Sequence, residues 1–256
     1  NAEAPEQTTT AGMVNGQGAQ SFLVIYDSVP GGTGYLKELM RDTEPLYEVF
    51  ERAAKIGTPT IYLGFTGGLS SSIHSAEQAQ AMISEAYPDF EFYVIDNLCP
   101  SAAAELLVVE AVRLAGNGAD AAELYEWAKE ARYYIQGYFT LDSFDALAAG
   151  GRIPLAAAQL GGKLDIKPVL SYDLNGSLTL KGVCRGRKKA LRALVSDFRE
   201  NWCQDLTLPI AIMHADAKKD ADWLEEHLRK EKGCEGLLII RSVISPVLGA
   251  HVGPGM

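Results

Sequence analysis

The feature that most constrains the fold is a threefold alternation of short apolar runs and helical segments between residues 21 and 137. Apolar spacing of three and four residues predicts helices over 35–55, 73–86, 101–115 and 120–134. Three intervening runs have the length and β-branched content of buried strands, and they cover residues 22–26, 60–65 and 90–96. Such alternation predicts a parallel sheet covered by helices on both faces, that is, a three-layer α/β lobe.

The second half of the chain has a different pattern. Asn175-Gly176 lies between two apolar strands, over 167–172 and 177–183, which is a strong signal for an antiparallel hairpin. Further strands are predicted over 137–141, 210–214 and 237–242, and helices over 144–149, 155–160, 188–202 and 220–230. We therefore expect a tail or loop over 1–20, an N-terminal α/β lobe over 21–137, and a mixed α/β lobe over 138–256.

Charge and residue types exclude several classes of function. The formal net charge of −10 argues against a broad nucleic-acid surface, which needs a basic face. No apolar run reaches the roughly 18 residues of a membrane helix. The four cysteines form no CxxC pair and the histidines show no metal-ligand spacing, so we expect no metal site, and reduced thiols in a cytoplasmic protein.

Three glycine-rich loops could carry chemistry. The first contains Ser70, Ser71 and Ser72 between a predicted strand and a predicted helix, where free backbone N–H groups and hydroxyls favour an anion. The second places Arg152 after two glycines, and the third holds His251 and Gly253 in a glycine-proline segment that we expect to be a stiff loop. Plainer interpretations remain open for each: a serine N-cap, a surface arginine and a structural histidine.

A basic cluster interrupts the acidic composition between residues 181 and 192. It includes Arg185, Arg187 and Lys188, with no acidic residue among them. The cluster is either a solvated helix start or a docking surface for an acidic partner.

Six short motifs resemble those of the DegV family of bacterial fatty-acid-binding proteins, and they occur in the family's order over residues 58–256. They are Thr66-Gly67-Gly68-Leu69-Ser70-Ser71-Ser72-Ile73-His74-Ser75-Ala76, Val94-Ile95-Asp96, Gly150-Gly151-Arg152-Ile153, Ile166-Lys167-Pro168-Val169-Leu170, Arg185-Gly186-Arg187-Lys188-Lys189-Ala190 and His251-Val252-Gly253-Pro254-Gly255. Residues 1–57 are atypical of the family, and its early Thr-Ser element has no clear copy; Thr8-Thr9-Thr10 and Thr43 are weak candidates.

The resemblance implies a two-lobed fold that binds one long-chain fatty acid in an apolar tunnel between the lobes. The matching positions imply that Ser70 and His251 hold the carboxylate, with Ser71, Ser72 and Gly253 completing the cradle. Family members present the bound acid to a separate fatty-acid kinase, which forms an acyl-phosphate for phospholipid synthesis. ATP and magnesium would belong to that partner, and Arg152, Arg185, Arg187 and Lys188 are the candidate docking residues.

By this resemblance the chain is a carrier with no catalytic residue and no cofactor of its own, with transient contact at a membrane surface left open. Two alternatives remain. One is a regulatory or interaction protein of the same fold that has lost lipid binding. The other is a small-molecule hydrolase using Ser70, although the GxSxG pattern is absent and no acid is placed to orient His251.

Overall fold

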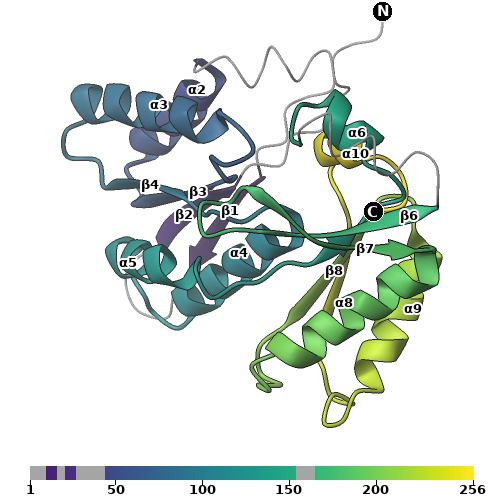
Figure 1. Cartoon of the computed structure of the whole chain (residues 1–256). Coiled ribbons are helices and arrows are strands. Elements are labelled where there is room, and N and C mark those ends of the chain that lie inside the picture. Colours follow the sequence, from purple (N-terminus) through teal and green to yellow (C-terminus); the bar gives the residue numbers. More distant parts are fainter. Residues whose placement is uncertain (1–9, 16–20, 27–43, 154–164) are drawn as a thin grey trace, which may run out of the picture. The chain divides into compact units, whose positions relative to one another are not determined.

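The computed structural model describes residues 10–15, 21–26, 44–153 and 165–256 (Figure 1). The chain divides into two compact units. Unit 1 contains the chain up to Pro100 together with Leu107–Ile135 and Leu174–Ser177, and unit 2 contains Ser101–Leu106, Gln136–Asp173 and Leu178–Met256.

Unit 1 is built on a four-stranded sheet in the order β1-β2-β3-β4. Its strands are β1 (Thr10–Asn15), β2 (Ser21–Tyr26), β3 (Thr60–Gly64) and β4 (Phe92–Asp96). The last three strands run parallel, and β1 pairs antiparallel with β2. Helices α2 (Glu44–Ile56) and α3 (Ser72–Ala86) lie on one face, and α4 (Ser101–Gly116) and α5 (Ala121–Ala131) lie on the other (Figure 1).

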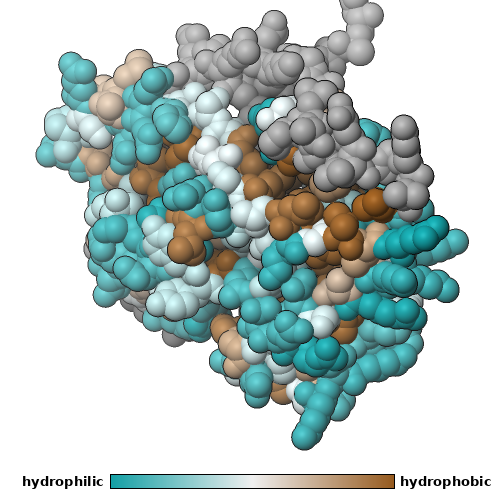
Figure 2. All heavy atoms as spheres, in the orientation of Figure 1, coloured by the Kyte–Doolittle hydropathy of each residue, from teal (hydrophilic) through white to brown (hydrophobic). Residues whose placement is uncertain are grey.

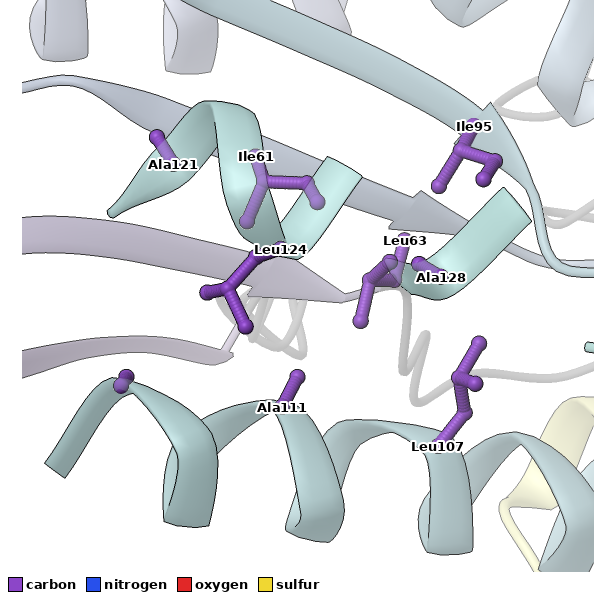
Figure 3. Close-up of a cluster of buried hydrophobic side chains, with 9 residues drawn as sticks. Ile61, Leu63, Ile95, Leu107, Ala111, Ala121, Leu124 and Ala128 are labelled. Atoms are coloured by element: carbon purple, nitrogen blue, oxygen red, sulfur yellow. The ribbon is translucent and has the colours of Figure 1, made fainter. Parts of the chain in front are cut away.

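Alternation along β3 builds a core on each face of this sheet. Ile61 and Leu63 pack with Ile95 of β4 and with small or apolar residues of α4 and α5, as Figure 3 shows. Tyr62 points to the opposite face and packs with Phe50 of α2 and apolar residues of α3. All the described side chains of β3 are buried, which explains its continuous apolar sequence, because a parallel strand covered on both faces has no solvent side.

Unit 2 combines an antiparallel sheet with a parallel pair of strands. The antiparallel sheet has the order β5-β6-β7, with β5 (Phe139–Thr140), β6 (Ile166–Tyr172) and β7 (Leu178–Arg185). The parallel pair is β8 (Ile210–His214) with β9 (Ile239–Val243). The helices are α6 (Asp145–Ala149), α8 (Arg187–Asn201), α9 (Lys218–Arg229) and α10 (Pro246–Val252).

Helices α8 and α9 are amphipathic, and each packs its apolar face against the strands of unit 2. Ala190, Leu191 and Leu194 of α8 pack against Val169 of β6, while Ala221 and Leu228 of α9 join Ile212 of β8 in a neighbouring cluster. Charged residues occupy their exposed faces, and Figure 2 shows hydrophilic residues covering this surface of both helices. The predicted α/β class, with a parallel sheet and an antiparallel hairpin, is therefore confirmed.

Two expectations need correction. The segment 1–20 was expected to be a tail or loop, but Thr10–Asn15 forms β1. Its backbone hydrogen bonds come from pairing with β2, and the irregular polar sequence of the segment does not predict that pairing. The segment around His251 was expected to be a loop, but it forms α10, capped by the Ser245 hydroxyl, which accepts from the Leu248 N–H. The predicted helix over 155–160 and residues 27–43 lie outside the described part of the chain.

Within the described residues no helix is both long and apolar enough to cross a membrane. All four cysteines lie in the described part of the chain, and none of them forms a disulfide bond.

Candidate functional site

The loop of residues 66–72, here called the head-group loop, joins the end of β3 to the start of α3. Ser70 and Ser72 are each only 6% exposed, whereas Ser71 is exposed at the N-cap position of α3. The Ser70 hydroxyl donates to the Ser72 hydroxyl over 3.1 Å and accepts from the Ser72 N–H over 3.2 Å. The loop therefore presents two adjacent hydroxyls, largely removed from solvent, at the start of a 15-residue helix.

Asp96, the last residue of β4, fixes the first half of this loop. Its Oδ2 accepts from the Gly67 N–H over 3.0 Å, and its Oδ1 accepts from the Leu98 N–H over 2.9 Å. A Cβ atom at Gly67 would lie 2.7 Å from that same Oδ2, so a side chain at this position would displace the carboxylate. Because β3 and β4 are parallel neighbours, their carboxyl ends meet at one edge, where ligands of such sheets bind.

Neither Asp96 nor Thr66 was assigned a role from the sequence, although both lie inside the family motifs. Thr66 is fully buried, and its carbonyl accepts from the Ser70 N–H over 3.1 Å. A threonine directly after a predicted strand and an aspartate at the end of a predicted strand are the sequence signals that could have identified both residues.

His251 lies in the last turn of α10 and is half-buried. A Cβ atom at Gly150 would come within 2.7 Å of the His251 Nδ1, so the imidazole ring rests directly against the backbone that follows α6. Gly253 ends α10 with φ +75°, a conformation that glycine adopts without strain. The Gly150-Gly151 motif and the His251–Gly253 motif, 100 residues apart in the sequence, are thus brought together within unit 2.

The residues after α10 are tied to the core of unit 2. The Gly255 N–H donates to the Ala215 carbonyl over 2.8 Å, and the Ala215 N–H donates to the Met256 carbonyl over 3.1 Å. A Cβ atom at Gly255, whose φ is +87°, would lie 2.3 Å from the Asp142 Oδ2. The glycine-proline segment therefore has a fixed course, which the sequence motif alone did not reveal.

The four predicted docking cations differ in their surroundings. Arg185 and Lys188 are exposed, while Arg152 donates through Nη1 to the Gly150 carbonyl over 2.5 Å. Arg187 is only 19% exposed in its side chain and donates from Nε to Asp220 of α9 over 2.7 Å. Arg187 is therefore held in an ion pair between α8 and α9, and its part in docking stays a prediction.

Charged partners occur around Arg187, but they do not form a metal site. Asp142 lies 4.0 Å from Nη1 of Arg187 and 3.2 Å from the Lys167 ammonium group, which is itself 3.3 Å from Asp165. Among the described residues no group of three or more histidine, cysteine, aspartate or glutamate side chains could hold a metal ion. The cluster is therefore an ion-pair network that links β6, α8 and α9.

Comparison with known sequences places the chain in a family. The model described as "Uncharacterised protein, DegV family" matches residues 40–256, and the chain belongs to the DegV family. A DegV domain-containing protein of Clostridium perfringens is 34% identical over 208 residues, which cover 81% of this chain and 71% of the relative. A second relative from Lactococcus lactis is 32% identical over 209 residues, with the same coverage of both chains.

Solved structures share the fold. A DegV lipid-binding protein from Thermotoga maritima matches with a TM-score of 0.70 and 27% identity, over 84% of this chain and 72% of that one. A second Thermotoga maritima protein, described as revealing a fatty-acid-binding function, matches with a TM-score of 0.66 and 26% identity, over the same shares. A Streptococcus pneumoniae protein, described as Fatty Acid Kinase B3 protein loaded with linoleic acid, matches in fold with a TM-score of 0.75 and 22% identity, over 92% of this chain and 76% of that one.

The ion pair of Arg187 generates the first testable prediction. We expect Arg187→Gln to lower the free energy of unfolding by about 1–2 kcal/mol, because a charged hydrogen bond is lost at a partly solvated site. Urea unfolding followed by circular dichroism measures the change. Lys188→Gln, at the neighbouring exposed position, is the matched control and should leave stability within about 0.5 kcal/mol of the parent. Equal effects of the two substitutions would contradict a structural role for Arg187.

Proposed function

We propose that this chain binds a long-chain fatty acid, with the carboxylate held at the head-group loop by Ser70 and Ser72. The observation that carries the proposal is the buried pair of hydroxyls at the start of α3. Two hydroxyls carry two protons, and the bond within the pair uses one of them. The other proton remains for a ligand. A carboxylate suits this role because it accepts hydrogen bonds through both of its oxygens.

The position of the pair favours a negatively charged group. Helix α3 carries no acidic residue in its first turn, so no carboxylate there offsets the partial positive charge of its N-terminus. Exposed backbone N–H groups at such a terminus bind carboxylates and phosphates. In the proposal Ser71, at the N-cap, contributes to this anion-binding terminus beside the two buried hydroxyls.

The acyl chain supplies most of the affinity in this proposal. Burying a chain of about 16 carbons in an apolar tunnel gains roughly 11 kcal/mol, at about 0.8 kcal/mol per methylene group. The cost of immobilising a flexible ligand removes much of that gain. The polar loop therefore determines which head group is accepted, while the tunnel determines how tightly the ligand is held.

His251 and Gly253 complete the proposed head-group site. An imidazole can donate a hydrogen bond to a carboxylate, and the ring of His251 rests against the backbone of Gly150. The relatives from Thermotoga maritima that bind lipid or fatty acid support this assignment of the chain to the same class of ligand.

A substitution series tests whether both residues contact the ligand. We expect Ser70→Ala and His251→Ala each to weaken binding of a long-chain fatty acid by about 10- to 100-fold, the cost of losing a hydrogen bond to a charged group. Native mass spectrometry of the delipidated protein with added fatty acid measures the dissociation constants. Ser84→Ala, at an exposed position of the same helix α3, is the matched control.

The double variant shows whether the two side chains act on one carboxylate. Coupled residues give a combined loss that differs from the product of the single losses, whereas independent residues give the product. Parent protein that retains no fatty acid after purification, and binds none on addition, would refute the proposed function and support an interaction protein.

We further propose that the bound acid is presented in the cytoplasm to a separate fatty-acid kinase, which supplies ATP, magnesium and all the catalysis. A solved neighbour described as a fatty acid kinase protein supports this partner class. Arg152, Arg185, Arg187 and Lys188 remain the proposed docking residues, and of these Arg185 and Lys188 are exposed.

Charge reversal tests the docking proposal. We expect Arg185→Glu combined with Lys188→Glu to reduce kinase-dependent acyl-phosphate formation at least about tenfold, because close like charges at an interface cost several kcal/mol. The fatty-acid content of the variant should equal that of the parent. Lys129→Glu, on the surface of α5 in unit 1, serves as the control. Unchanged turnover with the partner kinase would exclude these cations from the docking surface.

A further inference from the structure

The turn of the β6–β7 hairpin contacts the head-group loop from a distant part of the sequence. This turn, residues 174–177, belongs to unit 1, although both of its strands belong to unit 2. The fully buried Thr66 hydroxyl donates to the Gly176 carbonyl over 3.1 Å and accepts from the Gly68 N–H over 3.1 Å. A single hydroxyl therefore bridges the turn and the loop across 110 residues of sequence.

The backbones of the turn and the loop are in direct contact, and glycine is required on both sides. A Cβ atom at Gly68 would lie 2.5 Å from the Gly176 carbonyl carbon. A Cβ atom at Gly176 would lie 1.9 Å from the Thr66 Oγ1 and 2.9 Å from the Leu98 carbonyl oxygen. Gly176 also has a φ of +72°, which an L-residue with a side chain rarely adopts. The Asn-Gly turn thus has a second role besides reversing the direction of the chain, which is to pack against the head-group loop.

Thr66 links this contact to Ser70. The Thr66 carbonyl accepts from the Ser70 N–H, and the Ser70 hydroxyl in turn bonds to Ser72. A short series of hydrogen bonds therefore runs from Gly176 through Thr66 to the two hydroxyls. Leu98, whose carbonyl faces Gly176, has a φ of +55°, a costly conformation for leucine that the Asp96 carboxylate holds through the Leu98 N–H.

We propose that the hairpin turn, acting through the Thr66 hydroxyl, sets the geometry of the head-group loop and so determines its preference for a carboxylate. Thr66 and Gly176 are then positioning residues, and neither contacts the ligand. This inference rests on the proposed function, since it assigns the specificity of the same site. It predicts that loosening the turn changes which head group is accepted more than it changes the affinity for the acyl chain.

The test uses delipidated full-length protein and two readouts. The first is hydrogen exchange of the loop amides, Gly68 and Ser70 among them, without ligand. The second is the ratio of dissociation constants for palmitic acid and cetyl alcohol, which share a tail and differ in head group. The variants are Thr66→Val, which removes the hydroxyl, Thr66→Ser, which keeps it, and Gly176→Ala, which adds the clashing methyl group. Thr179→Val, on β7 of the same hairpin, is the control.

We expect Thr66→Val to speed exchange of the loop amides about tenfold and to reduce the preference for the acid about tenfold, the effect of one lost buried hydrogen bond. Affinity for the alcohol should stay near the parental value, and Thr66→Ser should restore both readouts. Gly176→Ala should behave like Thr66→Val.

Equal loss of acid and alcohol binding, or parental exchange rates in Thr66→Val, would overturn the proposal. A parent protein that binds neither compound would instead refute the proposed function, and the exchange rates would then decide by themselves whether the turn holds the loop.

Discussion

The structure around the candidate site depends on one constraint: a carboxylate at the end of β4 holds one backbone N–H group after β3 and one after β4. Asp96 accepts from both Gly67 and Leu98, so one side chain fixes the exits of two neighbouring parallel strands. A carboxylate that accepts two backbone N–H groups makes strong, charge-assisted hydrogen bonds. The loop then enters α3 with Ser70 and Ser72 buried beside the helix N-terminus, whose partial positive charge favours an anion.

A second level of organisation comes from residues that pack against glycine. His251 rests on Gly150, Asp142 lies against Gly255, and the turn at Gly176 lies against Thr66. In each case a side chain or carbonyl occupies the space that a Cβ atom would take. Gly150 and Gly255, which belong to family motifs, are therefore points of close side-chain contact, in addition to any freedom they give the backbone.

Much of this fold could be predicted from the sequence because its elements follow simple periodicities. The continuous apolar run of β3 reflects burial on both faces, and Asn175-Gly176 marked the β6–β7 hairpin directly. β1 could not be predicted, since its Thr- and Gly-containing sequence gains its strand structure from pairing with β2. Ser70 and Ser72 were predicted as site residues from a local motif and remain a prediction. Asp96 and Gly176 contact the loop through long-range hydrogen bonds, and the partners in these bonds cannot be read from a local pattern. The ion pair of Arg187 could not be predicted for the same reason, because its partner, Asp220, lies 33 residues away.

The most direct test of the central claim is a crystal structure of the delipidated protein after addition of palmitic acid. The proposed function predicts that one carboxylate oxygen lies within hydrogen-bonding distance, about 2.5–3.0 Å, of the Ser70 or Ser72 hydroxyl. A fatty acid bound with its carboxylate in solvent or against other residues would contradict the assignment of the head-group loop.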